Sequence, residues 1–103
     1  MFSNKRRNDV FEKCNGKCYY CGDHLDYDNF HMDHVIPKAK GGRGVIENLV
    51  AACCLCNLTK GDLTIPEFRE KIENLNGDTR VELFCKYRDV VYNPIVFYFE
   101  GGN

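Results

Sequence analysis

The sequence lacks a long hydrophobic run, an apolar leader, internal repeats and low-complexity segments. Without about 18 consecutive apolar residues, we expect no segment that crosses a membrane as a helix. The first residues, MFSNKRR, enter charged sequence at once and do not resemble a signal peptide. We therefore expect an intracellular, cytoplasmic protein with no membrane partner, whose cysteines stay reduced.

The sequence also lacks a charge excess of either sign. Its 14 Lys and Arg residues nearly balance 15 Asp and Glu residues, giving a formal net charge of −1. This balance argues against a nucleic-acid binder of the histone type, which depends on a strong positive field. Basic residues nevertheless gather in the first 17 positions and around residues 38–60. Such segregation permits a basic face, although solvated surface explains the basic start of the chain equally well.

The length of the chain bounds the size of its core. A chain of 103 residues is expected to form one domain, residues 1–103. A domain of this size buries only about 60–70% of its unfolded surface, so cross-links add much to its stability. The sequence contains seven cysteines, and this odd number argues against a complete set of disulfides.

Four of the cysteines form two Cys-x-x-Cys pairs with 31 residues between them: Cys18, Cys21, Cys53 and Cys56. Two thiolates spaced in this way can face one ion, and four sulfurs complete the closed tetrahedral shell of structural zinc. The interval is longer than the about 15–20 residues of a zinc ribbon. The added length holds a polar segment, so we expect the zinc to join the entry and exit of that segment.

Other interpretations of the cysteines stay open. All four could be inert buried residues, or Cys14 or Cys54 could replace one of the ligands. A redox role would need a pair that opens a helix after a buried strand, which neither pair does. We expect Cys14, Cys54 and Cys85 to be buried, apolar-type residues.

Local signals predict an α+β protein. Ser3 can cap a helix of about a dozen residues that ends near Gly16. This helix would place Val10, Phe11 and Cys14 on one face. The next expected elements, in order, are a zinc knuckle at 17–22, a polar loop at 23–29, a strand at 30–36, a flexible basic loop at 38–44, a strand at 49–52 and a short helix at 55–61.

A capping box at residues 64–67, with Pro66 inside the first turn, opens a further helix. This helix would run to about Leu75 and bury Phe68, Ile72 and Leu75. A short helix at 80–87 and a β-branched, aromatic strand at 90–99 are expected to follow. The aromatic stretch 95–99 could pair with a neighbouring molecule or complete the core, and we favour the core.

The polar segment between the cysteine pairs contains an Asp-His pair, Asp33-His34. Hydrolysis of a phosphodiester needs an activated water, a cation on the phosphate and stabilisation of the leaving oxygen. Histidine is suited to activate water, because its ordinary pKa of about 6.5 leaves it able to accept a proton. Asp33 and Asn57 offer oxygen ligands for one Mg²⁺ or Mn²⁺. An isolated Asp-His pair is more often a surface feature, so the surrounding residues decide whether this pair is catalytic.

The expected hairpin sets how these residues can cooperate. Alternation along a strand points Asp33 and His34 to opposite faces, so they act on one phosphate only if the strand twists or bulges. Asn48, across the hairpin, can bond the loop backbone or the histidine ring, or simply serve as a turn residue. His24 and His31 are better explained as exposed or core residues, although His31 could touch a substrate.

These motifs together resemble the HNH endonuclease family. The resemblance lies in CYYCG at 18–22, MDHVIP at 32–37, GG at 41–42, ENLV at 47–50 and CxxCNxxKG at 53–61. It covers a zinc clip and catalytic core at about residues 14–62, with the order and spacing intact, and these motifs are specific.

The resemblance implies a small zinc-stabilised ββα-metal fold, with an N-terminal helix and a C-terminal helix and strand added. It implies a phosphodiester hydrolase that nicks or cuts DNA. In this family's pattern His34 is the general base, Asp33 and Asn57 bind the catalytic cation, and Asn48 orients the site. The final position is often His in the family but is Asn57 here. We therefore expect Mg²⁺ or Mn²⁺ rather than a softer ion.

The basic residues around the central motif are candidates for phosphate contacts: Lys38, Lys40, Arg43 and Lys60. Such contacts position a duplex without reading its sequence. No segment resembles a recognition helix, so we expect double-stranded DNA to be bound with weak sequence preference and a steep salt dependence. Cutting of both strands by one active site requires a homodimer or successive nicks by a monomer.

Two rival interpretations remain at this point. A zinc-ribbon binding module would hold one metal and cut nothing, but it would require neither the Asp-His pair nor the two asparagines. A catalytically inactive HNH relative would bind nucleic acid without cleavage.

Overall fold

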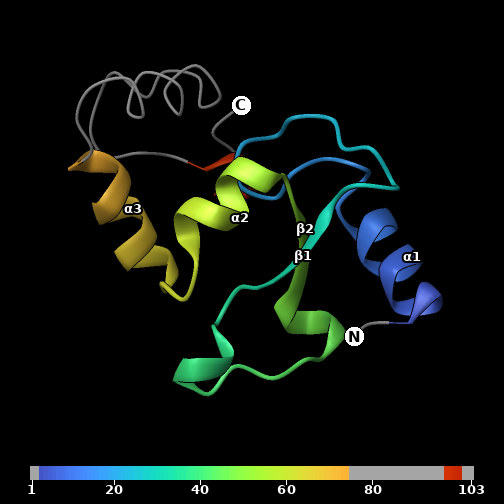
Figure 1. The fold of residues 1–103 in the computed structure, drawn as a ribbon, viewed down its shortest axis with the longest axis horizontal. Coiled ribbons are helices and arrows are strands. Elements are labelled where there is room, and N and C mark those ends of the chain that lie inside the picture. The colour runs from blue at the N-terminus through green and yellow to red at the C-terminus, as the bar shows by residue number, and fades with distance from the viewer. Residues whose placement is uncertain (1–2, 75–96, 101–103) are drawn as a thin grey trace.

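The computed structural model describes residues 3–74 and 97–100, which form a hairpin with helices on both sides. In Figure 1 the hairpin lies between α1 and α2, and α3 lies beyond α2. Its elements, in chain order, are α1 (Asn4–Lys13), β1 (His31–His34), the 3₁₀ turns η1 (Lys38–Lys40) and η2 (Ile46–Asn48), β2 (Leu49–Ala52), α2 (Cys54–Lys60), α3 (Ile65–Glu73) and the 3₁₀ turn η3 (Tyr98–Glu100). This is the expected α+β fold, in which two strands and α2 form the ββα unit.

The two strands pair antiparallel, and the register runs from His31 opposite Ala52 to His34 opposite Leu49. Every residue of β2 is buried, because α1 packs on this strand. On β1 only Asp33 is buried, and His34 is half-buried. The strand therefore directs Asp33 inward, whereas the alternation predicted only that Asp33 and His34 point to opposite faces.

The first helix is held by its cap and by one lysine. Ser3 accepts a hydrogen bond from the amide of Arg6 at 3.1 Å, which confirms the expected cap. The Nζ atom of Lys13 donates to the carbonyls of Ile46 and Leu49 at 2.7 and 2.9 Å. These contacts join the end of α1 to the start of β2.

The capping box of α3 is present as predicted. The hydroxyl of Thr64 accepts from the amide of Glu67, and the Glu67 carboxylate accepts from the amide of Thr64. Phe68 and Ile72 are fully buried. Leu75, the helix expected at 80–87 and Cys85 lie outside the described residues.

The end of the chain differs from the strand that we expected at 90–99. Its described part contains η3, although the amides of Tyr98 and Phe99 donate to the carbonyls of Tyr20 and Tyr19. Phe97 is fully buried and stacks on Phe68 with 5.0 Å between ring centroids. This residue of the aromatic tail therefore completes the core.

The loop between the strands is tightly held and is not the flexible connection that we expected. A Cβ atom at Gly42 would lie 1.6 Å from the carbonyl oxygen of Ile36, so the two backbones are in direct contact. The amide of Gly42 donates to the carbonyl of Pro37 at 2.9 Å. The first strand ends at His34 and not at Ile36. The backbone groups of Ile36 bond the side chain of Asn48 and do not pair with a strand.

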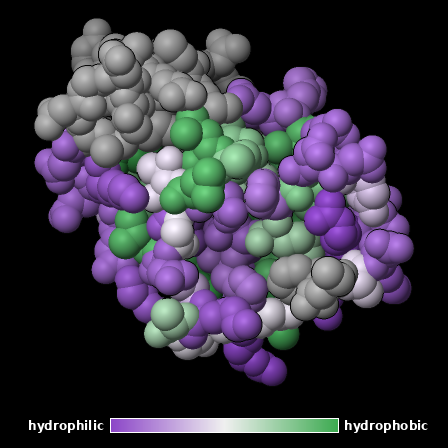
Figure 2. Space-filling model, viewed as in Figure 1, coloured by the Kyte–Doolittle hydropathy of each residue, from purple (hydrophilic) through white to green (hydrophobic). Residues whose placement is uncertain are grey.

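The surface seen in Figure 2 is mostly hydrophilic, and its hydrophobic side chains gather in separate patches. Among the described residues, no helix has the length and apolar character needed to cross a bilayer.

Candidate active site

Four cysteine sulfurs meet at the base of the hairpin: those of Cys18, Cys21, Cys53 and Cys56. The four Sγ atoms all lie within 4.8 Å of one another, and the sulfurs of Cys21 and Cys53 are 3.8 Å apart. Tetrahedral zinc with Zn–S bonds of about 2.3 Å separates its sulfurs by about 3.8 Å. The cluster therefore fits one structural zinc ion, which would fasten the zinc knuckle to the first turn of α2.

Backbone amides support the sulfurs in both halves of the clip. The amide of Cys21 donates to the Sγ of Cys18 at 3.5 Å, and that of Cys56 donates to the Sγ of Cys53 at 3.4 Å. The hydrogen bond between Cys53 and Cys18 lowers the pKa of the Cys53 thiol. The hydrogen bond between Cys56 and Cys18 raises the pKa of the Cys56 thiol. A bound cation would stabilise all four as thiolates.

The remaining described cysteines lie outside the cluster. Cys14 is buried, as expected, and its sulfur accepts from the amide of Ala51 at 3.3 Å. Burial raises the pKa of the Cys14 thiol. Cys54 is exposed, which corrects the expectation that it is buried. It occupies the first position of α2 and faces solvent. Cys53 caps this helix directly after the buried strand β2, which corrects the expectation that neither cysteine pair opens a helix after a buried strand.

Asp33 lies at the centre of a buried polar network that joins the zinc knuckle to α2. Its Oδ2 atom accepts a hydrogen bond of 2.5 Å from the hydroxyl of Tyr20. The same oxygen lies 3.1 Å from the Nζ of Lys60, whose side chain is 0% exposed. Burial, followed by the charge of Asp33, raises the pKa of the Tyr20 phenol. The hydroxyl therefore remains a donor at neutral pH.

Sequence reasoning missed the role of Tyr20 and assigned Lys60 to a phosphate contact. Both residues are completely buried, so the ammonium of Lys60 is not available to a phosphate on the surface. The only sequence signal for Lys60 is its place three residues after Asn57, on the same face of α2. No sequence signal connects Tyr20 with Asp33.

His34 follows Asp33 and is half-buried. Its carbonyl oxygen accepts from the Nζ of Lys60 at 2.9 Å, which fixes the backbone of the strand at this point. A Cβ atom at Gly44 would lie 3.7 Å from the Nε2 of His34, so the loop backbone passes beside the imidazole. The lack of a side chain at Gly44 leaves room next to the ring.

Asn48 bonds the loop backbone and not the histidine ring, which decides between the two alternatives that the sequence left open. Its Oδ1 accepts from the amide of Ile36 at 2.9 Å. Its Nδ2 donates to the carbonyls of Ile36 and Arg43, at 3.0 and 2.9 Å. The side chain therefore closes the loop that follows the Asp-His pair.

Asn57 is half-buried in the middle of α2. Helix α2 packs against β1, and Lys60, one turn after Asn57, reaches Asp33. Asn57 therefore lies on the helix face that turns toward the strand carrying Asp33 and His34. Carboxylate and amide oxygens are the ligands that Mg²⁺ and Mn²⁺ prefer, so the chemistry of this donor pair fits such a cation.

The other basic candidates have different surroundings. Lys40 donates to the carbonyl of Asp62 at 3.1 Å and to the carboxylate of Glu67 at 2.5 Å. Lys38 and Arg43 are exposed and form no ion pair within residues 3–74 and 97–100. His24 is exposed and His31 is half-buried at the start of β1.

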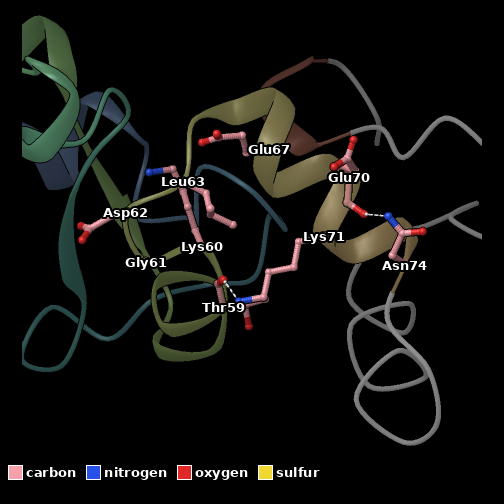
Figure 3. A pocket seen from close by; sticks show the side chains of 9 residues that line it. All are labelled: Thr59, Lys60, Gly61, Asp62, Leu63, Glu67, Glu70, Lys71 and Asn74. Atoms are coloured by element: carbon pink, nitrogen blue, oxygen red, sulfur yellow. Dashed lines mark hydrogen bonds between the residues drawn. The ribbon is translucent and has the colours of Figure 1, made fainter.

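A groove of about 580 Å³ lies between α2 and α3. Figure 3 shows the residues that line it, including Glu67, Glu70 and Lys71. Lys60 belongs to its lining but points away from Lys71, whose Nζ donates to the carbonyl of Thr59 at 2.8 Å. None of the four candidate catalytic residues lines this groove.

Comparison with known proteins identifies a family, and the relatives include a curated protein and a solved structure. The model of a family described as HNH endonuclease matches residues 18–73. A CRISPR-associated endonuclease Cas9 from Corynebacterium diphtheriae is 42% identical over 52 residues, which cover 50% of this chain and 5% of that protein. The crystal structure of the Type II-C Cas9 enzyme from Actinomyces naeslundii matches with a TM-score of 0.52 and 23% identity. This match covers 84% of this chain and 11% of that enzyme, and it shows a shared fold.

Proposed function

The chain belongs to the HNH endonuclease family, whose model spans more than half of it, and we propose that it is a metal-dependent DNA endonuclease. The observation that carries this proposal is the placement of Asp33 and His34 on β1 and of Asn48 at the start of the returning strand, with Asn57 in α2, the helix that packs on β1. A binding module would need none of these residues in this arrangement. The match of half the chain to a Cas9 endonuclease supports a nuclease function.

In this proposal His34 is the general base. Its backbone is held by Lys60 and its ring lies beside Gly44, so the position of the residue is fixed from both sides of the loop. A ring nitrogen would accept the proton of the attacking water. Asn48 would keep the loop beside the ring in place through its three hydrogen bonds. It would act as an orienting residue.

Asp33 and Asn57 would hold the catalytic Mg²⁺ or Mn²⁺. When bound, the cation would neutralise charge on the scissile phosphate and the leaving oxygen. Both contacts that the Asp33 carboxylate makes with residues 3–74 and 97–100 use Oδ2, so in this proposal Oδ1 would face the cation. The amide oxygen of Asn57 is a hard ligand and favours these ions over softer ones.

The proposed substrate is double-stranded DNA, bound with weak sequence preference. Lys38 and Arg43 are exposed basic residues of the loop that Asn48 closes, and no ion pair with the described residues occupies them, so they can contact phosphates near the site. Lys40 would contribute less, because its ammonium is already paired with Glu67. The chain spans 5% of the length of the Cas9 relative that it matches, so the activity of that whole protein is not assigned to it.

The decisive experiment incubates supercoiled plasmid with the zinc-loaded chain and Mg²⁺ or Mn²⁺. We expect nicked or linear product that disappears with EDTA and with His34→Ala. His24→Ala is the control, because this exposed histidine has no proposed role in catalysis or in substrate contact. Cleavage that survives His34→Ala would overturn the assignment of the base. Bound zinc without any divalent-dependent cleavage would favour the binding-module or inactive-relative interpretation.

A further inference from the structure

We propose that Tyr20 and Lys60 are positioning residues that fix one oxygen of Asp33 and thereby couple the zinc clip to the catalytic cation site. The inference rests on the proposed function, in which Asp33 is a ligand of that cation. Its basis is the network described above, in which a tyrosine from the zinc knuckle and a lysine from α2 meet on the same carboxylate oxygen.

The network is built from three separate parts of the chain, and water has little access to it. Tyr20 is 0% exposed, Lys60 is 1% exposed and Asp33 is 6% exposed. Hydrogen bonds to charged groups are strong and directional in such surroundings. Two donors on Oδ2 therefore restrict rotation of the carboxylate and present Oδ1 in one direction.

Lys60 also connects the two members of the Asp-His pair. Its Nζ lies 3.1 Å from Asp33 Oδ2 and donates to the carbonyl oxygen of His34 at 2.9 Å. One ammonium group thus sets the position of the metal-binding carboxylate and of the backbone that carries the base. Asn57 precedes Lys60 by one turn, so the same helix supplies the second proposed ligand.

Tyr20 connects this network to the zinc. It stands between Cys18 and Cys21, and its ring packs edge-on against Phe68 and Phe97 with centroids 5.5 and 5.9 Å apart. Packing therefore holds the ring, and the clip holds its backbone. The hydroxyl has one direction available, toward Asp33. Loss of zinc would release this donor together with the knuckle.

The neighbouring tyrosine provides a matched comparison. Tyr19 occupies the same knuckle and is partly buried against the core, where its ring stacks on Phe99 at 4.3 Å between centroids. Its hydroxyl does not contact Asp33. Tyr20→Phe and Tyr19→Phe therefore remove the same atom from adjacent residues, and only the first removal changes the network around Asp33.

The test measures Mn²⁺ binding to the full zinc-loaded chain by electron paramagnetic resonance of the free ion, without DNA. Partners that support a metal ligand typically contribute about 10-fold or more to metal affinity. We expect Tyr20→Phe to raise the Kd for Mn²⁺ about 10-fold, with unchanged zinc content and circular dichroism. Tyr19→Phe should bind Mn²⁺ as the wild type does. The Mn²⁺ concentration for half-maximal plasmid cleavage should shift by the same factor.

Tyr20→Phe is preferred to a change at Lys60, because loss of the lysine leaves a buried carboxylate unpaired and can prevent folding. A Tyr20→Phe protein with the Mn²⁺ affinity of the wild type overturns the inference. So does an Asp33→Asn protein that binds Mn²⁺ normally. If Tyr20→Phe weakens Mn²⁺ binding in a chain that cuts no DNA, the inference holds and the proposed nuclease function fails.

Discussion

The side-chain amide of Asn48 bonds both backbone groups of Ile36, twelve residues away: Oδ1 accepts from the Ile36 amide at 2.9 Å, and Nδ2 donates to its carbonyl at 3.0 Å. A third bond, to the carbonyl of Arg43, ties the far side of the loop to the same side chain. The amide of Val35 still donates to the carbonyl of Asn48 at 2.9 Å, and at Ile36 the asparagine side chain replaces the backbone partner. The geometry of the loop beside the proposed base depends on it.

Removal of this amide should reduce activity more than DNA binding. We expect Asn48→Ala to lower the rate of single-turnover cleavage by about 10-fold or more, since supporting contacts of this kind typically matter to that extent. The free energy of unfolding should fall by about 1–3 kcal/mol for the lost hydrogen bonds. Asn48→Asp is the informative comparison, because it keeps the acceptor for Ile36 but loses both donors. Full activity of either variant would contradict the orienting role.

Substitution of Gly42 should destabilise the same loop through the backbone. Alanine at this position would place its Cβ atom 1.6 Å from the carbonyl oxygen of Ile36, so the chain must move. We expect a loss of about 1–3 kcal/mol in urea unfolding, as for other overpacked sites. Gly44→Ala is the control, because its Cβ would meet only the His34 ring at an ordinary 3.7 Å. Equal stability of the two variants would contradict the close approach.

The chain should contain one zinc ion, and the ion should be essential to the fold. Structural zinc contributes about 10–16 kcal/mol of apparent binding free energy, which is comparable to the whole stability of a small domain. We expect Cys56→Ser to lose both the zinc and the cooperative thermal transition, whereas Cys54→Ser retains both because Cys54 is exposed and lies outside the cluster. Native mass spectrometry and circular dichroism measure the two properties. A chain that stays folded after chelation would contradict the prediction.

The ion pair between Lys40 and Glu67 should add stability that disappears in acid. The hydrogen bond with Lys40, with help from the Thr64 amide, lowers the pKa of Glu67 from 4.5 to about 2. The folded state therefore favours the charged form, so the contribution is complete above about pH 4.5 and is lost as the pH falls toward 2. We expect wild type to exceed Glu67→Gln in free energy of unfolding at pH 7. The difference should shrink below pH 4.5 and in high salt, because both groups are exposed.

That comparison is made by urea unfolding at each pH, on wild type and variant with matched zinc content. A difference that grows as the pH falls would contradict the sign of the pKa shift.

Binding of DNA should depend on salt through the exposed basic residues of the loop. Each phosphate contact contributes about −0.9 to the slope of log K against log salt on duplex DNA. We expect Lys38→Gln and Arg43→Gln each to make the slope less steep by about 0.9, measured by fluorescence anisotropy in Ca²⁺ to suppress cleavage. Lys5→Gln is the control, since Lys5 pairs with Asp9 on the exposed side of α1. An unchanged slope in both loop variants would place the DNA elsewhere.

Much of the fold could be predicted from local signals. The cap at Ser3 and the capping box at Thr64 and Glu67 are formed as expected, because they satisfy backbone amides within one turn of the chain. The return strand at Leu49–Ala52 has the expected bounds, and α2 begins within one residue of its expected start. Such features depend on neighbours in sequence, so spacing alone identifies them.

The sequence alone therefore determined the zinc ligands and the opposite directions of Asp33 and His34, since fixed spacing and strand alternation decide these points. Only the tertiary structure decided what surrounds them. The hydroxyl of Tyr20 and the ammonium of Lys60 reach Asp33 from positions 13 and 27 residues away in the chain, and no period or motif encodes such distances. The sequence predicted that Lys60 is exposed and that Cys54 is buried, and the structure shows the reverse. The rotation of α2 about its own axis, relative to the sheet, decides which of its side chains are buried. That rotation is set only in the folded molecule, where the four sulfurs and the hairpin hold the helix in one orientation.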